Sequence, residues 1–310
     1  MSTPTLSVVV LSWNTKALTL ACLRSLHAET PRHAREVIVV DNGSADGSPD
    51  AIAESYPDVR LVRNAENRLY AEGNNQGAAI ARGSYLCILN SDTEVHAGAL
   101  DGLVDFLEQN PDYGAASPKL INPDGSTQAA CRRFPGLLDA LVESTPLRGT
   151  SLGRKRSARG SMADFDHEHT RDVDQPPGAC MMMRTEEYLA LGGLDPELSL
   201  FYNDVDLCKR LWQGGRKIRY LAELLVVHHG GASTSGHGVW NPYWFVNREA
   251  YFTKHHGLFG RLWLRAVFYL WILVVGLGIT LGPKKLPEKR SAFGELRGHL
   301  RACSEKRHAA

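Results

Sequence analysis

The sequence lacks the cysteine patterns that hold a zinc ion or a disulfide framework. Its 310 residues include six cysteines, and no two of them form a Cys-x-x-Cys pair. Most of these cysteines lie in apolar runs, as the buried thiols of proteins from a reducing compartment do. We therefore expect neither a zinc site nor disulfides, and we expect a cytoplasmic protein.

The sequence also lacks an excess of charge of either sign. Its 35 Lys and Arg residues nearly balance 34 Asp and Glu residues, for a formal net charge of +1, so we expect no nucleic-acid partner. Two phosphate-binding fingerprints are missing: no Gly-x-Gly-x-x-Gly follows the first apolar run, and there is no Gly-x-x-x-x-Gly-Lys-Ser/Thr. The opening MSTPTLSVVVLSWN has no basic region and too short an apolar run for a secretory signal.

What the sequence does have, from Leu6 to about Ser117, is an alternation of apolar runs and helical patterns. We expect strands at residues 7–11, 36–40, 59–62 and 85–89, with helices at about 18–26, 51–56 and 73–81. Farther along we expect a strand at 178–183, helices at 185–191 and 204–213, and one or two strands within 217–229. Because the strands are continuously apolar, the pattern predicts an α/β fold with a mostly parallel central sheet covered by helices on both faces.

Two stretches depart from this pattern. Residues 147–175 are polar and charged, so we interpret them as a mobile loop without regular structure. Residues 266–281 carry no charge and are flanked by Arg and Lys on both sides. At about 1.5 Å per residue they span roughly 24 Å as a helix, less than a hydrocarbon core of about 30 Å.

We expect this C-terminal hydrophobic helical segment to lie at or shallowly in a membrane surface, because basic residues flank both ends. A helix buried against the domain, or a dimer contact, is the alternative. We therefore divide the chain into a catalytic domain at residues 1–257 and a hydrophobic and basic tail at residues 258–310. Within the domain we separate a first half, about 1–117, from a second half, about 118–257.

The stretch with the most chemical information ends at Asn90-Ser91-Asp92-Thr93, directly after a buried strand. The carboxyl edge of a parallel sheet is where open α/β folds bind ligands. Hard oxygen donors such as the Asp92 carboxylate suit Mg²⁺ or Mn²⁺ bridging a diphosphate. The alternative is an Asx-turn that caps the helix starting near Ala97.

Aromatic and polar residues also follow the first two strands. Ser12-Trp13-Asn14 ends the first strand, where an indole ring can stack on a nucleobase and the turn can hydrogen-bond its edge. The alternative for Trp13 is a plug in the core. Asp41 ends the second strand and can accept a hydrogen bond from a pyrimidine imide or a ribose hydroxyl. Its segment also fits a turn with Ser48 as helix N-cap, and both readings can hold.

Two further segments begin helices. In GNNQG, the small Gly73 and the amide of Asn74 near a helix N-terminus can approach a phosphate. After the aromatic run LFY, Asn203 precedes two carboxylates one residue apart, Asp204 and Asp206. One of these carboxylates can take a proton from an attacking hydroxyl if it lies within hydrogen-bonding reach. The alternative is that Asn203 or Asp204 only caps the helix.

Taken in order, these motifs resemble family 2 glycosyltransferases, in particular the rhamnosyltransferase-like branch of bacterial polysaccharide enzymes. The likeness covers residues 6–257 and rests on VVVLSWN, VIVVDNGSADGS, GNNQGAAIARGSYLCILNSDTE, QAACRRFPG, PPGACMMMRTEEYLALGGLDPELSLFYNDVDLCKRLWQGG and VVHHGGAST. Each motif alone is weakly specific, whereas all six in sequence are specific.

The resemblance implies a GT-A fold that binds a nucleoside-diphosphate sugar, a dTDP- or UDP-sugar, and a divalent cation. It places Trp13 and Asp41 at the nucleoside, and it makes Asp92 the metal ligand of a DxD-type motif. It makes Asp204 the catalytic base of an acidic pair before the acceptor helix. The first half of the domain becomes the donor half and the second half the acceptor half.

The resemblance leaves three other side chains with open alternatives. His228 is implied to support the metal or diphosphate; the adjacent His229 is its rival, and a structural histidine in a turn is the alternative. Arg132 and Arg133, beside a Phe-Pro pair, can face the diphosphate or the acceptor, but a solvated pair of arginines is an equal alternative.

The sequence departs from the family pattern at three places. The family commonly has Gly-Phe where this chain has Leu69-Tyr70, and Glu-Asp where it has Asn203-Asp204. The loss of an acidic neighbour should ease ionisation of Asp204, because a like charge raises a carboxyl pKa. Asn90 at the first position of the DxD motif is a usual variation in this branch.

We therefore expect an inverting glycosyltransferase that moves a hexose or deoxyhexose, such as rhamnose, to a hydroxyl of a lipid-linked or growing cell-surface glycan. It would be peripheral on, or shallowly anchored in, the inner face of the cell membrane. One alternative is a catalytically silent glycosyltransferase-like subunit that binds glycan or serves as a scaffold. The other is a sugar nucleotidyltransferase, which would need a glycine- and lysine-rich loop where this chain has SWNTKALT.

Overall fold

The computed structural model describes residues 4–28, 30–230 and 242–281, together with residues 294, 297, 298, 300 and 301. The chain forms two compact units. The sheet unit comprises Met1–Arg133, Phe165–Pro196 and Asn203–Gly236, and the helical unit comprises Phe134–Asp164, Glu197–Tyr202 and His237–Ala310.

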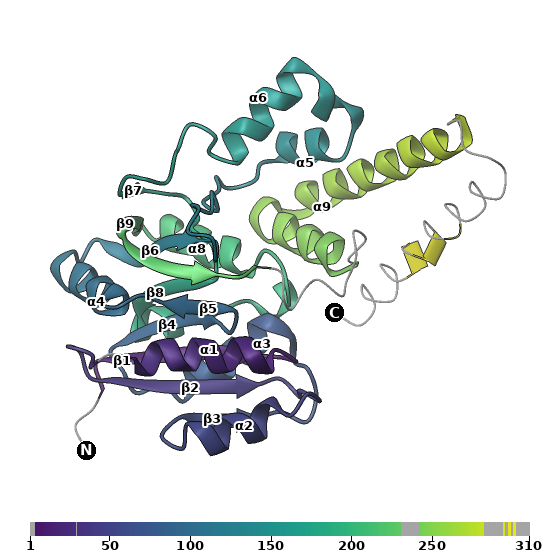
Figure 1. Ribbon diagram of the computed structural model, residues 1–310. Coiled ribbons are helices and arrows are strands. Elements are labelled where there is room, and N and C mark those ends of the chain that lie inside the picture. Colours follow the sequence, from purple (N-terminus) through teal and green to yellow (C-terminus); the bar gives the residue numbers. More distant parts are fainter. Residues whose placement is uncertain are drawn as a thin grey trace. The chain divides into compact units, whose positions relative to one another are not determined.

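The sheet unit begins with alternating strands and helices (Figure 1). Its strands are β1 (Leu6–Ser12), β2 (Arg35–Asp41), β3 (Arg60–Arg63), β4 (Tyr85–Asn90), β5 (Thr93–Val95), β6 (Tyr113–Ile121), β7 (Arg171–Asp172), β8 (Cys180–Arg184) and β9 (Lys217–His228). Its helices are α1 (Lys16–His27), α2 (Ser48–Ser55), α3 (Leu69–Ala79), α4 (Ala99–Gln109), α7 (Thr185–Ala190) and α8 (Asn203–Gln213). The 3-10 helix η2 (Pro196–Leu198) has its first residue in the sheet unit and the other two in the helical unit.

These strands form one sheet in the order β3-β2-β1-β4-β8-β6-β9-β5, with β7 paired to β9. The first four strands in this order, from β3 to β4, are parallel, as their apolar runs predicted. Strand β8 is antiparallel to both β4 and β6, and β9 is parallel to β6. The sheet is therefore mixed, and β1, β2, β4, β6 and β9 all point the same way.

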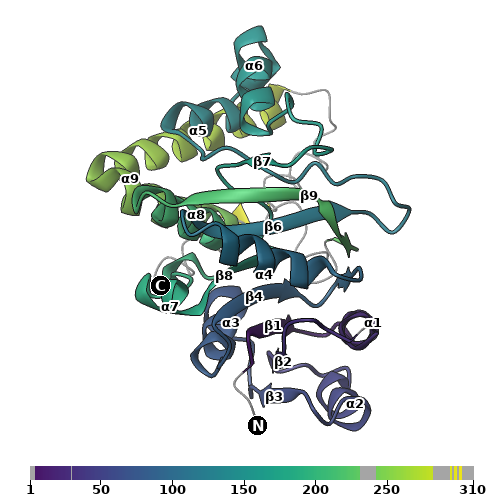
Figure 2. The same ribbon diagram turned by 90° about the vertical axis from the view of Figure 1, so that its left-hand side faces the viewer.

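Both faces of the sheet carry helices, as expected; Figure 2 shows α2 and α3 on opposite sides of the strands. Alternate residues of β1 explain this, since neighbouring side chains of a strand point to opposite faces. Val8 and Val10 belong to the core cluster that includes residues of α1, α2 and α4. Val9 faces α3, where a Cβ added at Gly77 would lie 2.4 Å from the Val9 Cγ1. The glycine therefore lets α3 pack closely on the sheet.

The helical unit contains α5 (Leu137–Glu143), the 3-10 helix η1 (Pro146–Gly149), α6 (Ser151–Gly160) and α9 (Pro242–Leu281). Helix α9 is 40 residues long and breaks at Gly257, which has a left-handed φ of 62°. An ion pair between Arg248 and Glu143 (2.9 Å) and a hydrogen bond from the Trp263 indole to the Leu137 carbonyl (2.9 Å) attach α9 to α5.

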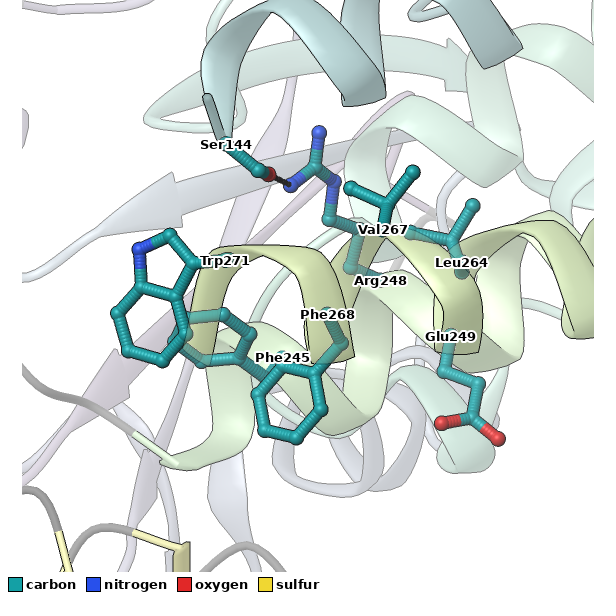
Figure 3. A pocket seen from close by; sticks show the side chains of 8 residues that line it. All are labelled: Ser144, Phe245, Arg248, Glu249, Leu264, Val267, Phe268 and Trp271. Carbon is teal, nitrogen blue, oxygen red and sulfur yellow. Dashed lines mark hydrogen bonds between the residues drawn. The ribbon is translucent and has the colours of Figure 1, made fainter. Parts of the chain in front are cut away.

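A small pocket in the helical unit is lined by Ser144 and by seven residues of α9 (Figure 3). The rings of Phe268 and Trp271 stack in it with centroids 5.9 Å apart, and the buried Arg248 donates to the Ser144 hydroxyl at 3.1 Å. The ring of Phe245, before the break, lies 5.3 Å from that of Phe268, after it, so the two parts of α9 pack against each other. Our division of the chain at residue 257 accordingly differs from the division into the sheet and helical units.

Several expectations need correction. Residues 147–175 are not without regular structure, because η1, α6 and β7 lie within or overlap them. The Thr150 hydroxyl caps α6 by accepting from the Gly153 N–H, and an Arg156–Asp139 ion pair ties α6 to α5. These polar contacts replace the apolar periodicity whose lack suggested a loop. Strands β5 and β6 were not identified. The expectation of one or two strands within 217–229 agrees with the single strand β9 (Lys217–His228).

Helix α9 is also longer than the apolar run that we read from the sequence. By length and composition alone it is able to cross a membrane, with a mean hydropathy of 2.1 in its most apolar window, and 17% of that window is buried. The basic residues at 284, 285, 289 and 290, the end of the VVHHGGAST motif and Cys303 lie outside the described residues. The five described cysteines are buried and free, as expected.

Candidate active site

The strand directions bring the predicted segments to one edge of the sheet. Trp13, Asp41 and Asp92 follow the carboxyl ends of the parallel strands β1, β2 and β4. His228 ends β9, which points the same way. Because β8 runs in the opposite direction, its beginning, just after Gly178, lies at this same edge. The expected ligand edge of the α/β sheet thus contains most of the predicted site.

Asp41 is almost fully buried at the end of β2, with 1% of its surface exposed. Its Oδ1 accepts a hydrogen bond from the Ser44 N–H at 2.9 Å, whereas its Oδ2 is buried with no hydrogen-bond partner among the described residues. A buried carboxylate oxygen without a donor costs free energy unless a ligand supplies one. Trp13, the residue after β1, is partly buried.

Asp92 is likewise nearly buried, and its Oδ1 lies 3.5 Å from the His228 Nε2. The pairing of β5 with β9 produces this approach, because Thr93 stands opposite His228 in the register. The ring of His229 pairs instead with Glu94 at 2.8 Å. Of the two adjacent histidines, His228 is therefore the one that faces Asp92.

The hydrogen bonds of Gln128 fix the tautomer of His228. The Gln128 Nε2 donates to the Asn122 Oδ1 at 2.7 Å and to the His228 carbonyl at 2.6 Å, so its Oε1 is the atom left to accept. That Oε1 lies 2.9 Å from the His228 Nδ1, which must carry the proton. In a neutral ring the Nε2 lone pair then faces the Asp92 carboxylate. Two acceptors that face each other need a cation or a proton between them.

Asp204 lies in the first turn of α8, and burial raises its pKa above the ordinary aspartate value. Hydrogen bonds from the Val205 N–H (2.8 Å), the Gly178 N–H and the Gln175 side chain (3.2 Å) oppose this rise. A Cβ at Gly178 would lie 3.0 Å from the Asp204 Oδ2, so the glycine permits the close contact. The absence of an acidic neighbour therefore does not leave this carboxyl with a low pKa.

Asp206 has a different environment. It is fully buried, and its Oδ2 lies 2.8 Å from the Arg210 Nε one helical turn later. The same guanidinium donates to the carbonyls of Leu191 and Gly193, both at 2.7 Å. Asp206 thus anchors α8 to the preceding turn, and its carboxylate is engaged by Arg210.

Tyr70 connects the turn after β4, which contains Asp92, with the segment against Asp204. Its hydroxyl lies 3.1 Å from the Asn90 Oδ1 and 2.9 Å from the Gly178 carbonyl oxygen. Burial, and then the charge of Asp204, raises the pKa of Tyr70 well above its usual value. The phenol therefore keeps its proton at neutral pH.

Comparison with known proteins agrees with this geometry. The model of the family "Glycosyl transferase family 2" matches residues 7–172, more than half of the chain. The chain belongs to glycosyltransferase family 2. It is 28% identical over 223 residues to the N-acetylglucosaminyl-diphospho-decaprenol L-rhamnosyltransferase of Mycobacterium tuberculosis, covering 68% of this chain and 72% of that protein.

Two further proteins support the family and the fold. The O-antigen biosynthesis protein RfbC of Myxococcus xanthus is 30% identical over 252 residues, covering 80% of this chain but only 19% of that protein. The structure of a mannosyltransferase from Pyrobaculum calidifontis, in complex with GDP-Man and Mn²⁺, aligns with a TM-score of 0.54 at 19% identity. The alignment covers 99% of this chain and 88% of that one. The GT-A fold and the rhamnosyltransferase-like resemblance are thus confirmed.

Not every donor-side residue predicted for this glycosyltransferase has a side chain free for a ligand. The Ser12 hydroxyl is buried and lies 2.9 Å from that of Thr19. Asn14 is exposed, and its side-chain oxygen accepts from the Ala45 N–H at 2.8 Å. These two residues hold the ends of β1 and β2 in place.

Our expectation that Gly73 lies at a helix N-terminus is wrong, because α3 begins four residues earlier. Gly73 lies within the helix, where a Cβ would come 2.4 Å from a methyl of Leu11. Asn74 is buried and donates to the Tyr70 carbonyl at 2.9 Å. Both residues thus contact the protein, although the Asn74 Oδ1 is buried with no hydrogen-bond partner among the described residues.

Of the predicted pair Arg132 and Arg133, Arg132 contacts the site through its backbone. The Arg132 N–H donates to the Gln175 carbonyl at 2.9 Å, which positions the residue whose amide reaches Asp204. The exposed Arg132 side chain donates to the carbonyls of Ala129 and Cys131, and Arg133 is partly buried. Asn203 accepts from the Asp204 N–H at 2.7 Å, so it supports the start of α8.

Three residues of the site were not singled out from the sequence: Gln128, Gln175 and Gly178. Gln128 and Gly178 stand inside the quoted motifs QAACRRFPG and PPGACMMM, which marked the segments but not these side chains or their contacts. No local signal identifies Gln175, because its role depends on its pairing with Arg132.

A second group of possible metal ligands consists of His33, Asp105 and Glu108. His33 directly precedes β2, so the group lies toward the amino ends of the parallel strands, and the other two residues belong to α4. Asp105 is already paired with His33 at 2.7 Å and with Arg32 at 2.5 Å. Since the arginine neutralises this carboxylate, we assign no site there.

Proposed function

We propose that the protein is an inverting, metal-dependent glycosyltransferase that uses a dTDP- or UDP-sugar as donor. The acceptor would be a hydroxyl of a lipid-linked or growing cell-surface glycan. The observation that carries this proposal is the placement of Asp204, a carboxylate with a raised pKa, at the sheet edge that also holds Asp41 and Asp92. A general base works best when its pKa approaches the working pH.

The donor residues divide into two groups. The unpartnered Oδ2 of Asp41 is suited to accept from the imide N–H of uracil or thymine, and Trp13 is suited to stack on the base. Asp92 and His228 suit a divalent cation, because two neighbouring ligands on an ion with bonds of about 2.1 Å stand roughly 3 Å apart. Their oxygen and nitrogen atoms lie 3.5 Å apart with both lone pairs facing inward. A bound Mg²⁺ or Mn²⁺ would offset the charge of the leaving diphosphate.

Asp204 would accept the proton of the acceptor hydroxyl as its oxygen attacks the anomeric carbon. The new carbon–oxygen bond forms on the face opposite the diphosphate, and the bond to the diphosphate oxygen breaks. One displacement of this kind inverts the anomeric centre and needs no covalent enzyme intermediate. Gln175 and Gly178 hold the carboxylate, and Asn203 holds the backbone before it.

The lipid-linked acceptor and the membrane location rest on separate observations. The name of the Mycobacterium tuberculosis relative specifies a diphospho-decaprenol substrate. Helix α9 exposes large apolar side chains along its second part, among them Leu273 (58%), Leu277 (49%) and Leu281 (80%). We propose that this face binds the cytoplasmic side of the cell membrane, where such a lipid carrier is found in the bilayer.

The test is hydrolysis and transfer with a panel of nucleotide sugars in the presence of Mn²⁺. Turnover of a dTDP- or UDP-sugar that stops with EDTA and returns with Mn²⁺ supports the proposal. Binding of glycan without turnover of any donor would favour the alternative, a catalytically silent subunit. Formation of a nucleotide sugar from a nucleoside triphosphate and a sugar phosphate would favour the nucleotidyltransferase.

A further inference from the structure

The contacts of Tyr70 constrain the side chain of Asn90 more tightly than their distances alone suggest. The phenol oxygen lies within hydrogen-bonding distance of two partners, the Gly178 carbonyl at 2.9 Å and the Asn90 amide at 3.1 Å. A phenol has one proton to donate. The Gly178 carbonyl can only accept, whereas an amide group can either donate or accept.

Both contacts are satisfied in only one way. In the structure the Asn90 Oδ1 faces the phenol, so two acceptors share its one proton. If the amide is turned by half a turn, Tyr70 donates its proton to the Gly178 carbonyl, and the Asn90 amide nitrogen donates to the phenol oxygen. The oxygen and nitrogen of an amide occupy equivalent positions, and a half-turn exchanges them without moving the rest of the side chain. The amide oxygen of Asn90 then lies on the side away from Tyr70. The Asn90 side chain makes no other hydrogen bond among the described residues.

We propose that Tyr70 is a positioning residue that holds the Asn90 amide in one orientation, so that its oxygen, and not its nitrogen, faces the cation and diphosphate. This inference rests on the proposed function and names a residue that acts through Asn90. An aspartate at position 90 would present an oxygen in either orientation, but an asparagine has to be oriented. Phenylalanine, which the family commonly has at the position of Tyr70, lacks the hydroxyl that does this.

Hydrogen bonds also fix the backbone of Leu69, the residue before Tyr70. Leu69 has a left-handed φ of 64°, a conformation that costs a residue with a side chain roughly 1 kcal/mol or more. Its N–H donates to the Asn67 side chain at 2.7 Å, and its carbonyl accepts from the Asn42 side chain at 3.1 Å. Asn42 and Asn67 are themselves hydrogen-bonded at 3.0 Å. This network fixes where α3 begins and therefore where the Tyr70 ring points.

The first test reads the orientation in the full-length protein without any ligand. With selectively labelled Tyr and Asn, we expect a nuclear Overhauser effect between the Tyr70 ring protons next to the hydroxyl and the Asn90 side-chain amide protons. Asn90→Asp identifies the signal, because the amide protons are then gone. If the wild-type protein lacks this cross-peak although the Asn90 amide signal is assigned, the proposal is overturned.

The second test is a double-mutant cycle of Tyr70→Phe and Asn90→Ala, read by calorimetry of UDP, and separately dTDP, with Mn²⁺. Tyr70→Phe should weaken Mn²⁺-dependent nucleotide binding about 3- to 10-fold, the size expected for one hydrogen bond. In the Asn90→Ala background it should have no further effect. Equal losses in both backgrounds would mean that Tyr70 acts through packing or through Gly178, which contradicts the proposal. If the wild-type protein binds neither nucleotide while the cross-peak is present, the proposed function fails and the orientation of Asn90 stands.

Discussion

Asp204→Asn and Asp206→Asn should change stability in opposite directions, although only one residue separates the two. The Asp206 carboxylate is fully buried against Arg210, whose guanidinium also holds two backbone carbonyls. Removal of one partner of a buried ion pair costs about 3–5 kcal/mol. Because the asparagine side chain still has one oxygen that can accept from Arg210, we expect the lower end of this range, a loss of about 3 kcal/mol in the free energy of unfolding. At about 2–4 °C per kcal/mol, the melting temperature should fall by roughly 6 °C or more.

Asp204 behaves in the opposite way because burial raises its pKa. A carboxyl whose pKa is higher in the folded than in the unfolded protein binds its proton more tightly when folded. The stability it contributes is present below its unfolded pKa and is lost as the pH rises through its folded pKa. At pH 8 the wild-type protein therefore carries the cost of a buried charge, and Asp204→Asn removes it. The variant should melt at or above the wild-type temperature at pH 8, with the difference shrinking toward pH 4.

Activity separates the two variants again. Asp204→Asn should lower turnover by about 10²- to 10⁴-fold, the contribution of a positioned general base. In the wild-type enzyme the rate should rise with pH as Asp204 loses its proton, with a midpoint above the ordinary aspartate range. Asp206→Asn should keep most of its turnover per folded molecule at a temperature where it is folded.

The assays are scanning calorimetry of the three proteins from pH 4 to pH 8 and initial rates with a nucleotide sugar and Mn²⁺. Two outcomes would refute the reasoning. If Asp204→Asn melts below the wild-type protein at pH 8, the Asp204 carboxylate stabilises the fold and our account of its burial is wrong. If Asp206→Asn melts like the wild type yet loses more turnover than Asp204→Asn, the base is the other carboxylate.

Three further predictions concern the donor site and the membrane. Asp92→Ala should abolish Mn²⁺-dependent binding of UDP in calorimetry while the melting temperature stays near that of the wild type; unchanged affinity would remove Asp92 from the metal site. Asp41→Asn should weaken UDP binding about 10-fold or more but not CDP binding, because the new amide donor opposes the uracil imide and suits the cytosine ring nitrogen; equal effects on both nucleotides would contradict the contact. Replacing Leu273, Leu277 and Leu281 with serine should lower partitioning onto anionic vesicles about 10-fold or more in flotation; unchanged partitioning would exclude this face as the membrane contact. These substitutions are preferable to deletion after residue 257, which would remove the packed residues of α9.

The ligand edge could be predicted because it depends on local patterns. The continuous apolar runs of β1, β2 and β4 identified buried parallel strands, and the residues after such strands must meet at one edge. The direction of β8 could not be predicted in this way. Its run of three methionines predicts a strand but contains nothing that sets its direction. Because β8 is antiparallel to β4, the site contains Gly178 at its beginning and not Arg184 at its end.

The choice between Asp204 and Asp206 was within reach of the sequence. Arg210 stands four residues after Asp206, the spacing at which helical ion pairs form, whereas the corresponding residue for Asp204 is Cys208. This spacing already indicates a structural role for Asp206. The contact between Tyr70 and Gly178 was out of reach, because 108 residues separate the two in the chain and only the pairing of β4 with β8 brings them together.

The departures from ordinary local structure gather where the chemistry is proposed. Among the described residues, five non-glycine residues have a positive φ, and three of them adjoin predicted site segments: Asn14 after β1, Leu69 before Tyr70, and Tyr202 before Asn203. Two electrostatic departures belong to the same segments. The Oδ2 of Asp41 is buried without a hydrogen-bond partner among the described residues, and the pKa of Asp204 is raised. Each of these features costs folding free energy, and such costs persist where the surrounding structure enforces them. A bound nucleotide, cation or acceptor proton would offset the two electrostatic costs. The backbone strain, by contrast, stays when the ligands leave, so it fixes the geometry of the site before they bind.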